Sequence, residues 1–318
     1  MKVRIFYHDN CFDGLASAAV FSQFYKLRFD PQAEFCYAGL THKAGGQNFH
    51  DLVFDGDENV IVDFRYYSSD RLTWWFDHHQ SAFSTPEDEQ HFLRDTSGKK
   101  FYDPQFRSCT KFIATIAAER FGFDTANLKE LIHWADTIDG AQYPDPETAV
   151  DISGPAMQLL IVIETCKDPA RLTQLIQAMR TQSLPEIAQQ PYVADQFRPL
   201  YERHLKSMET IRQSSHVYGK VIFFDVSEHS MEGYNKFIPY YLHPSSVYSV
   251  SISHSPNRTK VSVGFNPWSP LARVHNLASI CERYGGGGHA VVAAISYGPD
   301  DQAIARKAAQ EIIAELNR

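Results

Sequence analysis

The chain has 318 residues, of which 43% are hydrophobic and 21% charged, the balance of a globular protein long enough for two domains. Its 38 acidic residues outnumber its 30 Lys and Arg residues. The resulting formal charge of -8 argues against a broad, sequence-independent grip on long duplex DNA, but it allows a short nucleotide held by a metal and a few Arg residues.

The cysteines and the N-terminus indicate the compartment. The five Cys residues include no CxxC pair, and they indicate reduced thiols of a cytosolic protein rather than a disulfide framework or a zinc site. Residues 1–7 resemble a short apolar strand and not a signal peptide, and no apolar stretch approaches the ~20 residues that span a bilayer. We therefore expect a cytoplasmic protein without membrane contact.

The chain begins with a strand, a polar loop and a helix. Val3–Tyr7 is a buried-strand pattern, and small and apolar residues run from Leu15 to Phe24 after the loop that holds His8, Asp9 and Asp13. A helix cap alone would explain Asp13. It would not explain His8 and Asp9, and so we favour a site at this strand end.

Two further strands end in potential ligands. Residues 33–38 are a second strand, residues 59–64 a third that ends at Asp63, and residues 71–76 a fourth that leads into Asp77-His78-His79. Neighbouring side chains on a strand point to opposite faces, so the last three donors must be divided between metal, substrate and support. The alternatives are that Asp63 caps a helical turn at 68–70, and that Asp77 caps a following helix beside two surface histidines.

Residues 80–102 are polar and are predicted to be loop, and two helices follow at 108–121 and 128–137. The second helix runs into Asp136 and Asp139, which are three residues apart and therefore could face the same side of a helical turn. Gly140 could simply cap this helix. Acidic residues at a helix C-terminus oppose the helix dipole, a conflict that a bound cation would relieve.

The rest of the chain divides into helices and then a mixed region. We predict helices at 156–163, 171–179, 196–214, 276–284 and 303–316, a connector at 181–190, and strands at 217–225, 247–253, 260–265 and 291–295. The domains are expected to be 1–185 and 216–318, joined by a helical connector at 186–215.

A glycine-rich sequence, residues 285–289, follows the helix at 276–284. Gly285, Gly286, Gly287 and Gly288 would let backbone N–H groups approach a phosphate, and His289 could contact the phosphate or the 3′ end of a nucleotide. A helix cap would need only one glycine. Nearby aromatic residues could stack on a base, although most are expected to pack in the core: Tyr234, Phe237, Tyr240, Tyr241 and Trp268.

These motifs resemble those of the DHH phosphoesterase family, in order and over nearly the whole chain. The resemblance rests on the His8/Asp9/Asp13 loop, Asp63, Asp77-His78-His79, Asp136 and the GGGGH sequence at 285–289. It implies an α/β fold: an N-terminal DHH domain with a parallel sheet flanked by helices, a helical connector, a smaller C-terminal α/β DHH-associated domain, and an active site in the cleft between the domains.

The resemblance also implies site roles. The implied metal ligands are His8 and Asp9 for one ion, Asp13, His78 and Asp136 for the other, and Asp63 as a bridge between them. Asp77 would orient an imidazole, and His79 would face the phosphate. The implied substrate-binding residues are Gly286, Gly287, Gly288 and His289, with Arg258, Lys260 or Arg273 in place of an Arg that relatives carry where His254 stands.

The first motif departs from the family pattern, because Cys11 and Phe12 intervene after the polar residues. The choice between Asp9 and Asn10, and between Asp136 and Asp139, therefore stays open. Oxygen and imidazole donors without a thiolate favour two Mn²⁺ ions, or Mg²⁺, over structural zinc. Such a pair can activate water for attack on phosphorus.

The expected function is that of a metal-dependent phosphodiesterase or phosphatase, an enzyme that acts on short oligonucleotides or on small nucleotides such as 3′-phosphoadenosine 5′-phosphate or a linear dinucleotide. The alternatives are a pyrophosphatase or exopolyphosphatase, and a nucleotide-binding regulator with weakened catalysis. The expected partner is a short nucleic acid or small nucleotide substrate, and a homodimer is one option for the oligomeric state.

Overall fold

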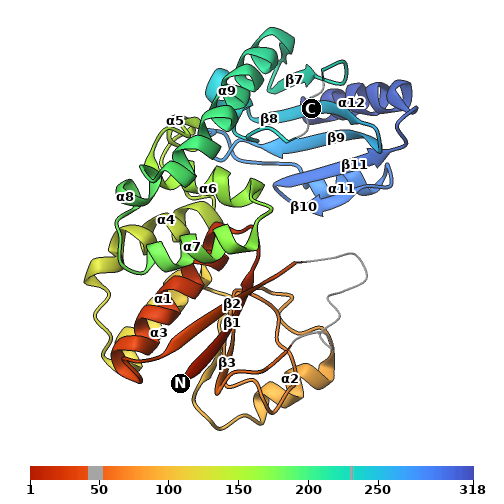
Figure 1. Ribbon diagram of the computed structural model, residues 1–318. Coiled ribbons are helices and arrows are strands. Elements are labelled where there is room, and N and C mark those ends of the chain that lie inside the picture. Colours follow the sequence, from red (N-terminus) through yellow and green to blue (C-terminus); the bar gives the residue numbers. More distant parts are fainter. Residues whose placement is uncertain (42–52, 230, 232) are drawn as a thin grey trace. The chain divides into compact units, whose positions relative to one another are not determined.

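The structure is a computed structural model that describes residues 1–41, 53–229, 231 and 233–318. It divides into two compact units (Figure 1). The first contains Met1–Tyr143 and Ser153–Arg198, and the second contains Pro144–Ile152 and Pro199–Arg318. The domain limits expected at residues 185 and 215 stay predictions.

The first unit is built on a five-stranded, fully parallel sheet. Its strands lie in the order β2 (Glu34–Leu40), β1 (Lys2–His8), β3 (Glu58–Val62), β4 (Trp74–Asp77) and β5 (Lys100–Tyr102). β3 and β4 are buried along their whole length, as expected of parallel strands covered on both faces. Because the strands are parallel, their carboxyl ends meet at one edge of the sheet.

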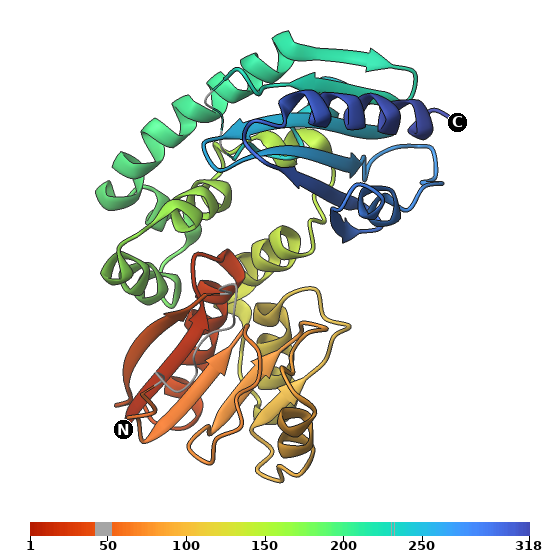
Figure 2. The same cartoon turned by 90° about the vertical axis from the view of Figure 1, so that its right-hand side faces the viewer.

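Helices cover both faces of this sheet (Figure 2). On one face, Phe21 of α1 (Phe12–Arg28) contacts Trp74 at 5.6 Å between ring centroids, and α3 (Cys109–Phe121) packs beside α1. On the other face, Phe92 of α2 (Pro86–Leu93) lies 5.2 Å from Trp75. The remaining helices of this unit are α4 (Lys129–Asp139), α6 (Pro155–Thr165), α7 (Pro169–Met179), α8 (Leu184–Ala188), the 3₁₀ turn Ala126–Leu128 and the first part of α9 (Pro191–Ser214).

The second unit has a six-stranded mixed sheet. Its order is β10 (Gly287–His289), β11 (Val292–Tyr297), β9 (Arg258–Phe265), β8 (Tyr248–Ser255), β7 (Val221–Asp225) and β6 (Ser215–Tyr218), antiparallel except for the β7–β8 pair. Helices α11 (Leu277–Glu282) and α12 (Gln302–Leu316) pack on this sheet and close a core that includes Val250, Ile295 and Ile312. Short helices α5 (Pro146–Val150) and α10 (Ile238–Leu242) also belong to this unit.

The predicted α/β class, with a parallel sheet flanked by helices and a second α/β unit, is confirmed. Two local predictions are wrong: the segment 80–102 is not loop, because it contains α2 and β5, and 217–225 is not one strand, because it is a hairpin that turns at Gly219. Residues 68–70, the helical turn in the alternative explanation of Asp63, are not helical, and residues 287–289 of the glycine-rich sequence form a short strand. Within the described residues, no helix is both long and apolar enough to cross a bilayer.

Candidate metal centre and cationic hollow

Polar side chains gather at the carboxyl edge of the parallel sheet. His8 is the last residue of β1, Asp63 follows β3, and Asp77 is the last residue of β4, with His78 and His79 directly after it. Adjacent β1, β3 and β4 therefore deliver these groups side by side.

Asp63 is at the centre of the group. It is 1% exposed, and its φ of 56° lies in the left-handed region, where a non-glycine residue costs about 1–3 kcal/mol. Its backbone N–H donates to the carbonyl of Phe76 at 3.0 Å, which fixes this conformation. Asp63 Oδ2 lies 3.3 Å from His8 Nδ1, and Asp63 Oδ1 lies 3.4 Å from His78 Nε2, so each oxygen faces a different imidazole.

His78 is held by a backbone contact behind it. Its Nδ1 donates to the carbonyl of Phe106 at 3.1 Å, which leaves Nε2, once deprotonated, as the nitrogen that can bind a cation. His78 Nε2 also lies 3.5 Å from Asp139 Oδ2 and 3.8 Å from Asp13 Oδ2. A neutral imidazole held in this tautomer is a typical ligand of a divalent cation.

Asp13 is fixed by the start of α3. Its two oxygens accept hydrogen bonds from the backbone N–H of Cys109 at 2.7 Å and of Thr110 at 3.0 Å. The helix N-terminus compensates part of the charge of this buried carboxylate. Asp13 is therefore both an anchor between α1 and α3 and a donor that faces His78.

Asp77 and His79 form a separate pair. Asp77 Oδ1 accepts from His79 Nδ1 at 2.7 Å and from the backbone N–H of His78 at 2.9 Å, and Asp77 is fully buried. This contact leaves His79 Nε2 away from the carboxylate and holds the ring in one orientation. The predicted orienting role of Asp77 stays a prediction, with a geometry that supports it.

The charges in the group are unbalanced. Burial and the neighbouring Asp63 raise the pKa of Asp13 and of Asp139. Burial opposes the ionisation of Asp63, but the imidazoles of His78 and His8 outweigh it and lower the pKa of this carboxyl. Burial also opposes protonation of His78, yet contacts with Asp63 and Asp13 raise its pKa. Three carboxylates that share so few positive charges are the environment that a divalent cation would stabilise.

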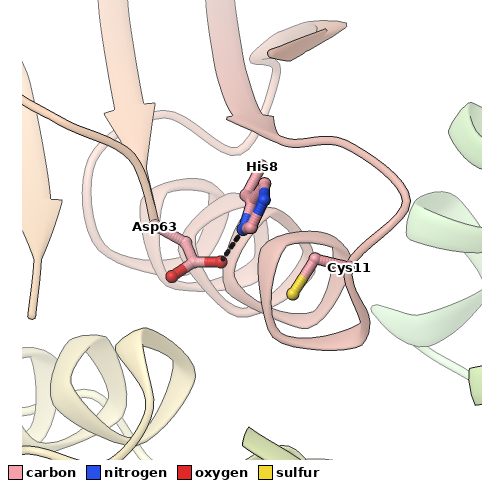
Figure 3. A group of neighbouring side chains, drawn as sticks. All are labelled: His8, Cys11 and Asp63. Atoms are coloured by element: carbon pink, nitrogen blue, oxygen red, sulfur yellow. Dashed lines mark ion pairs between the residues drawn. The ribbon is translucent and has the colours of Figure 1, made fainter. Parts of the chain in front are cut away.

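Several donors lack conventional partners. Neither oxygen of Asp63 accepts a well-formed hydrogen bond from the described residues, and the same holds for His78 Nε2. Buried polar atoms without partners cost free energy, and a bound ion is one explanation for them. The donors form three sets, and within each set the ligand atoms all lie within 4.8 Å of one another: Asp13/His78/Asp139, Asp63/His78/His79 and His8/Cys11/Asp63. Figure 3 shows the last of these sets, with His8 between Asp63 and Cys11. The residues present therefore fit a centre for divalent cations.

The second unit contains a cationic hollow of about 850 Å³. Lys236, Arg258, Lys260, His254 and His289 line it, and no carboxylate is among its described lining residues. Burial and the neighbouring Arg258 lower the pKa of Lys260. The hollow has the charge and the size to hold a phosphorylated ligand.

The glycines beside this hollow have different roles. A Cβ at Gly286 would lie 2.3 Å from the carbonyl oxygen of Ala294, and one at Gly288 would lie 2.5 Å from that of Val292. Close packing against β11 therefore explains the glycine at both positions, and the φ of 147° at Gly288 is a second reason for glycine there. A Cβ at Gly287 would meet nothing within 4 Å, and Gly287 lines the hollow. Packing within the protein therefore does not explain why residue 287 is a glycine, whereas a ligand in the hollow would.

The comparisons with known proteins agree on the fold. No family model matches the sequence, and no curated protein matches it. A solved pGpG-specific phosphodiesterase, PggH from Vibrio cholerae, aligns with a TM-score of 0.73 and 20% identity over 100% of this chain and 99% of that chain. A DHH domain described as a member of the S1p family of ribosomal proteins aligns with a TM-score of 0.59 and 12% identity over 100% and 87%.

The fold is that of the DHH-domain proteins. RecJ from Thermus thermophilus, solved in complex with Mn²⁺, also aligns, with a TM-score of 0.50 and 13% identity over 99% of this chain and 52% of that chain. The likeness at these identities concerns the DHH fold.

Not every predicted ligand of the DHH motifs lies in the three donor sets. Asp9 Oδ1 accepts from the backbone N–H of Asn10, and the Asn10 side chain donates to the carbonyls of Ile163 and Cys166. Asp136 accepts from Ser108 Oγ at 3.3 Å, whereas Asp139 faces His78. Among the described donor sets, the geometry therefore favours Asp139 over Asp136 and includes neither Asp9 nor Asn10. The metal-binding roles of Asp9 and Asp136 stay predictions.

The predicted substrate residues are also divided. Gly287, Gly288, His289, Arg258 and its alternative Lys260 line the hollow, whereas Arg273 donates to the carbonyl of His275. The aromatic residues mostly pack as expected: Tyr240 is buried, and Phe237 and Trp268 form an edge contact. Tyr234 lines the hollow.

Sequence reasoning missed Lys236 in the hollow and Cys11 beside His8 and Asp63. A Cys directly before a helix, where Ser, Thr, Asp or Asn is preferred, was the available signal for the second.

Proposed function

We propose that the protein is a divalent-metal-dependent phosphodiesterase that hydrolyses short oligonucleotides or small nucleotides. The observation that carries this proposal is the Asp63 carboxylate, which directs one oxygen to His8 and the other to His78 from a strained, buried position. This arrangement suits a carboxylate that bridges two cations.

In this proposal, bound Mn²⁺ or Mg²⁺ would supply a Lewis acid that activates water and stabilises negative charge on phosphoryl oxygens. His8, Asp13, Asp63, His78 and Asp139 would hold the ions. Asp77 fixes the His79 ring. Burial opposes protonation of this imidazole, but the Asp77 carboxylate outweighs it and raises the pKa of His79, so that the protonated ring can donate from Nε2 to a phosphate oxygen. The side of the sheet that holds these groups is largely buried, which strengthens each electrostatic contact.

The cationic hollow is evidence in favour of a substrate that carries phosphate groups. Burial and, after it, repulsion from Arg258 lower the pKa of Lys260, and a bound anion would offset both effects. The hollow of about 850 Å³ is larger than pyrophosphate requires, which favours a ligand with bases over pyrophosphate. PggH, which shares the fold over the whole chain, is a pGpG-specific phosphodiesterase, and it supports the same substrate class.

The test is a substrate panel in the presence of Mn²⁺ and, separately, of EDTA. It contains pGpG, other short RNA and DNA, 3′-phosphoadenosine 5′-phosphate, a cyclic dinucleotide and pyrophosphate. We expect the highest kcat/KM for a linear dinucleotide or short oligonucleotide, and no turnover in EDTA. Faster hydrolysis of pyrophosphate, or turnover that EDTA leaves unchanged, would contradict the proposal.

The role of the hollow is tested by Arg258→Gln. A hydrogen bond to a charged group contributes about 1.5–3 kcal/mol, so KM should rise by roughly tenfold or more. Lys307→Gln on α12 is the matched control, because the Lys307 side chain is 79% exposed and lies outside the lining of the hollow. An unchanged KM for the Arg258 variant would remove this hollow from substrate binding.

A further inference from the structure

The sulfur of Cys11 lies where it can contribute to the metal centre. Ligand atoms of His8, Cys11 and Asp63 are all within 4.8 Å of one another (Figure 3). A metal bonds to sulfur at about 2.3 Å and to imidazole nitrogen at about 2.0–2.1 Å, so donors around one ion lie roughly 3–4 Å apart. Side-chain shifts of less than about 1 Å would therefore bring these three donors onto a single cation.

Cys11 is an unusual residue for the start of a helix, although the backbone N–H of Gly14 interacts with its sulfur. Cys11 is the N-cap residue of α1, and it makes no side-chain capping hydrogen bond. A Ser, Thr, Asp or Asn there would stabilise the helix by about 1 kcal/mol. A sequence that departs from the helix rule at this residue, beside a buried carboxylate, indicates a functional constraint.

Asp63 supplies an independent indication of a ligand. It is 1% exposed, both its oxygens lack hydrogen-bond partners among the described residues, and Oδ2 is the oxygen that faces His8. The carboxylate thus points unsatisfied into the space that Cys11 adjoins.

We propose that Cys11 Sγ is a ligand of the cation held by His8 and Asp63, so that this position binds thiophilic divalent ions such as Zn²⁺, Co²⁺ and Cd²⁺ more tightly than an oxygen and imidazole set would. The inference rests on the proposed metal-dependent function and refines it, because a thiolate changes which ion is preferred. Binding replaces the S–H proton, which is released to solvent, by an S–metal bond. This proposal differs from the expectation of a centre without thiolate.

The experiment is Co²⁺ titration of the full-length protein after metal removal, followed by absorption spectroscopy. Thiolate coordination gives an intense charge-transfer band in the near ultraviolet, whereas carboxylate and imidazole ligands give only weak visible bands. We expect the intense band in the unmodified protein and in Cys36→Ser, and its loss in Cys11→Ser. Cys36 is a partly buried thiol of β2 outside the three donor sets, and Ser is favoured at the N-cap, so both variants should fold.

A competition assay between Cd²⁺ and Mn²⁺ supplies a second measurement. Cys11→Ser should reduce the ratio of Cd²⁺ to Mn²⁺ affinity at least roughly tenfold, the scale on which ligand surroundings alter metal binding. An intense band that persists in Cys11→Ser, or weak visible bands alone in the unmodified protein, would overturn the role of Cys11 and leave the metal centre standing. Absence of any bound Co²⁺ or Mn²⁺ would overturn both proposals.

Discussion

Asp63→Asn is the substitution that most directly tests the metal centre. Asn has nearly the shape of Asp and tolerates the left-handed backbone at φ 56°. The change therefore removes the charge from the carboxylate that faces both His8 and His78 without introducing a backbone clash.

The size of the effect follows from ligand linkage. An ion present at 100 times its Kd stabilises the folded state by about 2.7 kcal/mol, so two ions contribute about 5 kcal/mol. For a domain of about 150–250 residues, each kcal/mol shifts Tm by about 2–4 °C. Mn²⁺ should therefore raise the Tm of the unmodified protein by about 10–20 °C above its value in EDTA. In Asp63→Asn this difference should fall by at least half, because both ions lose a ligand.

The assay is thermal unfolding followed by tryptophan fluorescence, since Trp74 and Trp75 are buried in the strand that leads to the site. In EDTA the variant should remain folded, because Asn fits the same backbone conformation and no well-formed hydrogen bond to the Asp63 oxygens is lost among the described residues. Turnover of a dinucleotide should fall to background. A variant that keeps the full Mn²⁺-dependent shift in Tm would refute the bridging role, whatever happens to its activity.

Five further substitutions, two matched pairs and one single change, separate the roles of neighbouring residues. Asp139→Asn should reduce Mn²⁺ affinity by about 10–100-fold in isothermal titration, whereas Asp136→Asn should change it much less; the reverse order would restore Asp136 as the ligand. Gly288→Ala should lower the free energy of unfolding by about 1–3 kcal/mol or more, because its φ is 147° and the carbonyl of Val292 is close. Gly287→Ala should leave this free energy within about 0.5 kcal/mol of its original value and should raise KM instead. Chemical denaturation measures the first quantity and steady-state kinetics the second. His289→Ala should raise KM with bound Mn²⁺ unchanged, and an unaltered KM would remove this residue from the substrate site.

The polar residues at the carboxyl edge of the sheet could be predicted from the sequence, because each of them follows a local pattern. An apolar strand that stops at His8, Asp63 or Asp77 can be recognised from a few residues, and parallel strands bring such ends together. The order of the strands places these residues next to each other. Which donor faces which neighbour depends on side-chain directions, and these were not predictable.

The helical turn with Asp136 and Asp139 illustrates the limit. A spacing of three residues puts both carboxylates on one side of the helix. Only the folded position of Ser108 shows that Asp136 accepts a hydrogen bond from this hydroxyl, whereas Asp139 does not. The same applies to the hollow, whose basic residues come from separate segments, at Lys236, His254, Arg258–Lys260 and His289.

Helix α2 was missed for a different reason. Its polar sequence has no buried residue and hence no apolar stripe, so periodicity gives no signal. Its start was nevertheless visible, because Thr85 and Asp88 form a capping box and Pro86 occupies the first turn.

The donors of the metal centre are far apart along the polypeptide, and this has a consequence for biosynthesis. His8 is synthesised long before Asp139, which lies at the end of α4. At about 5–20 residues per second, roughly 7–26 s pass between the synthesis of these two donors. In the proposed centre, a cation that needs both donors would therefore be bound only when translation of the first unit is well advanced.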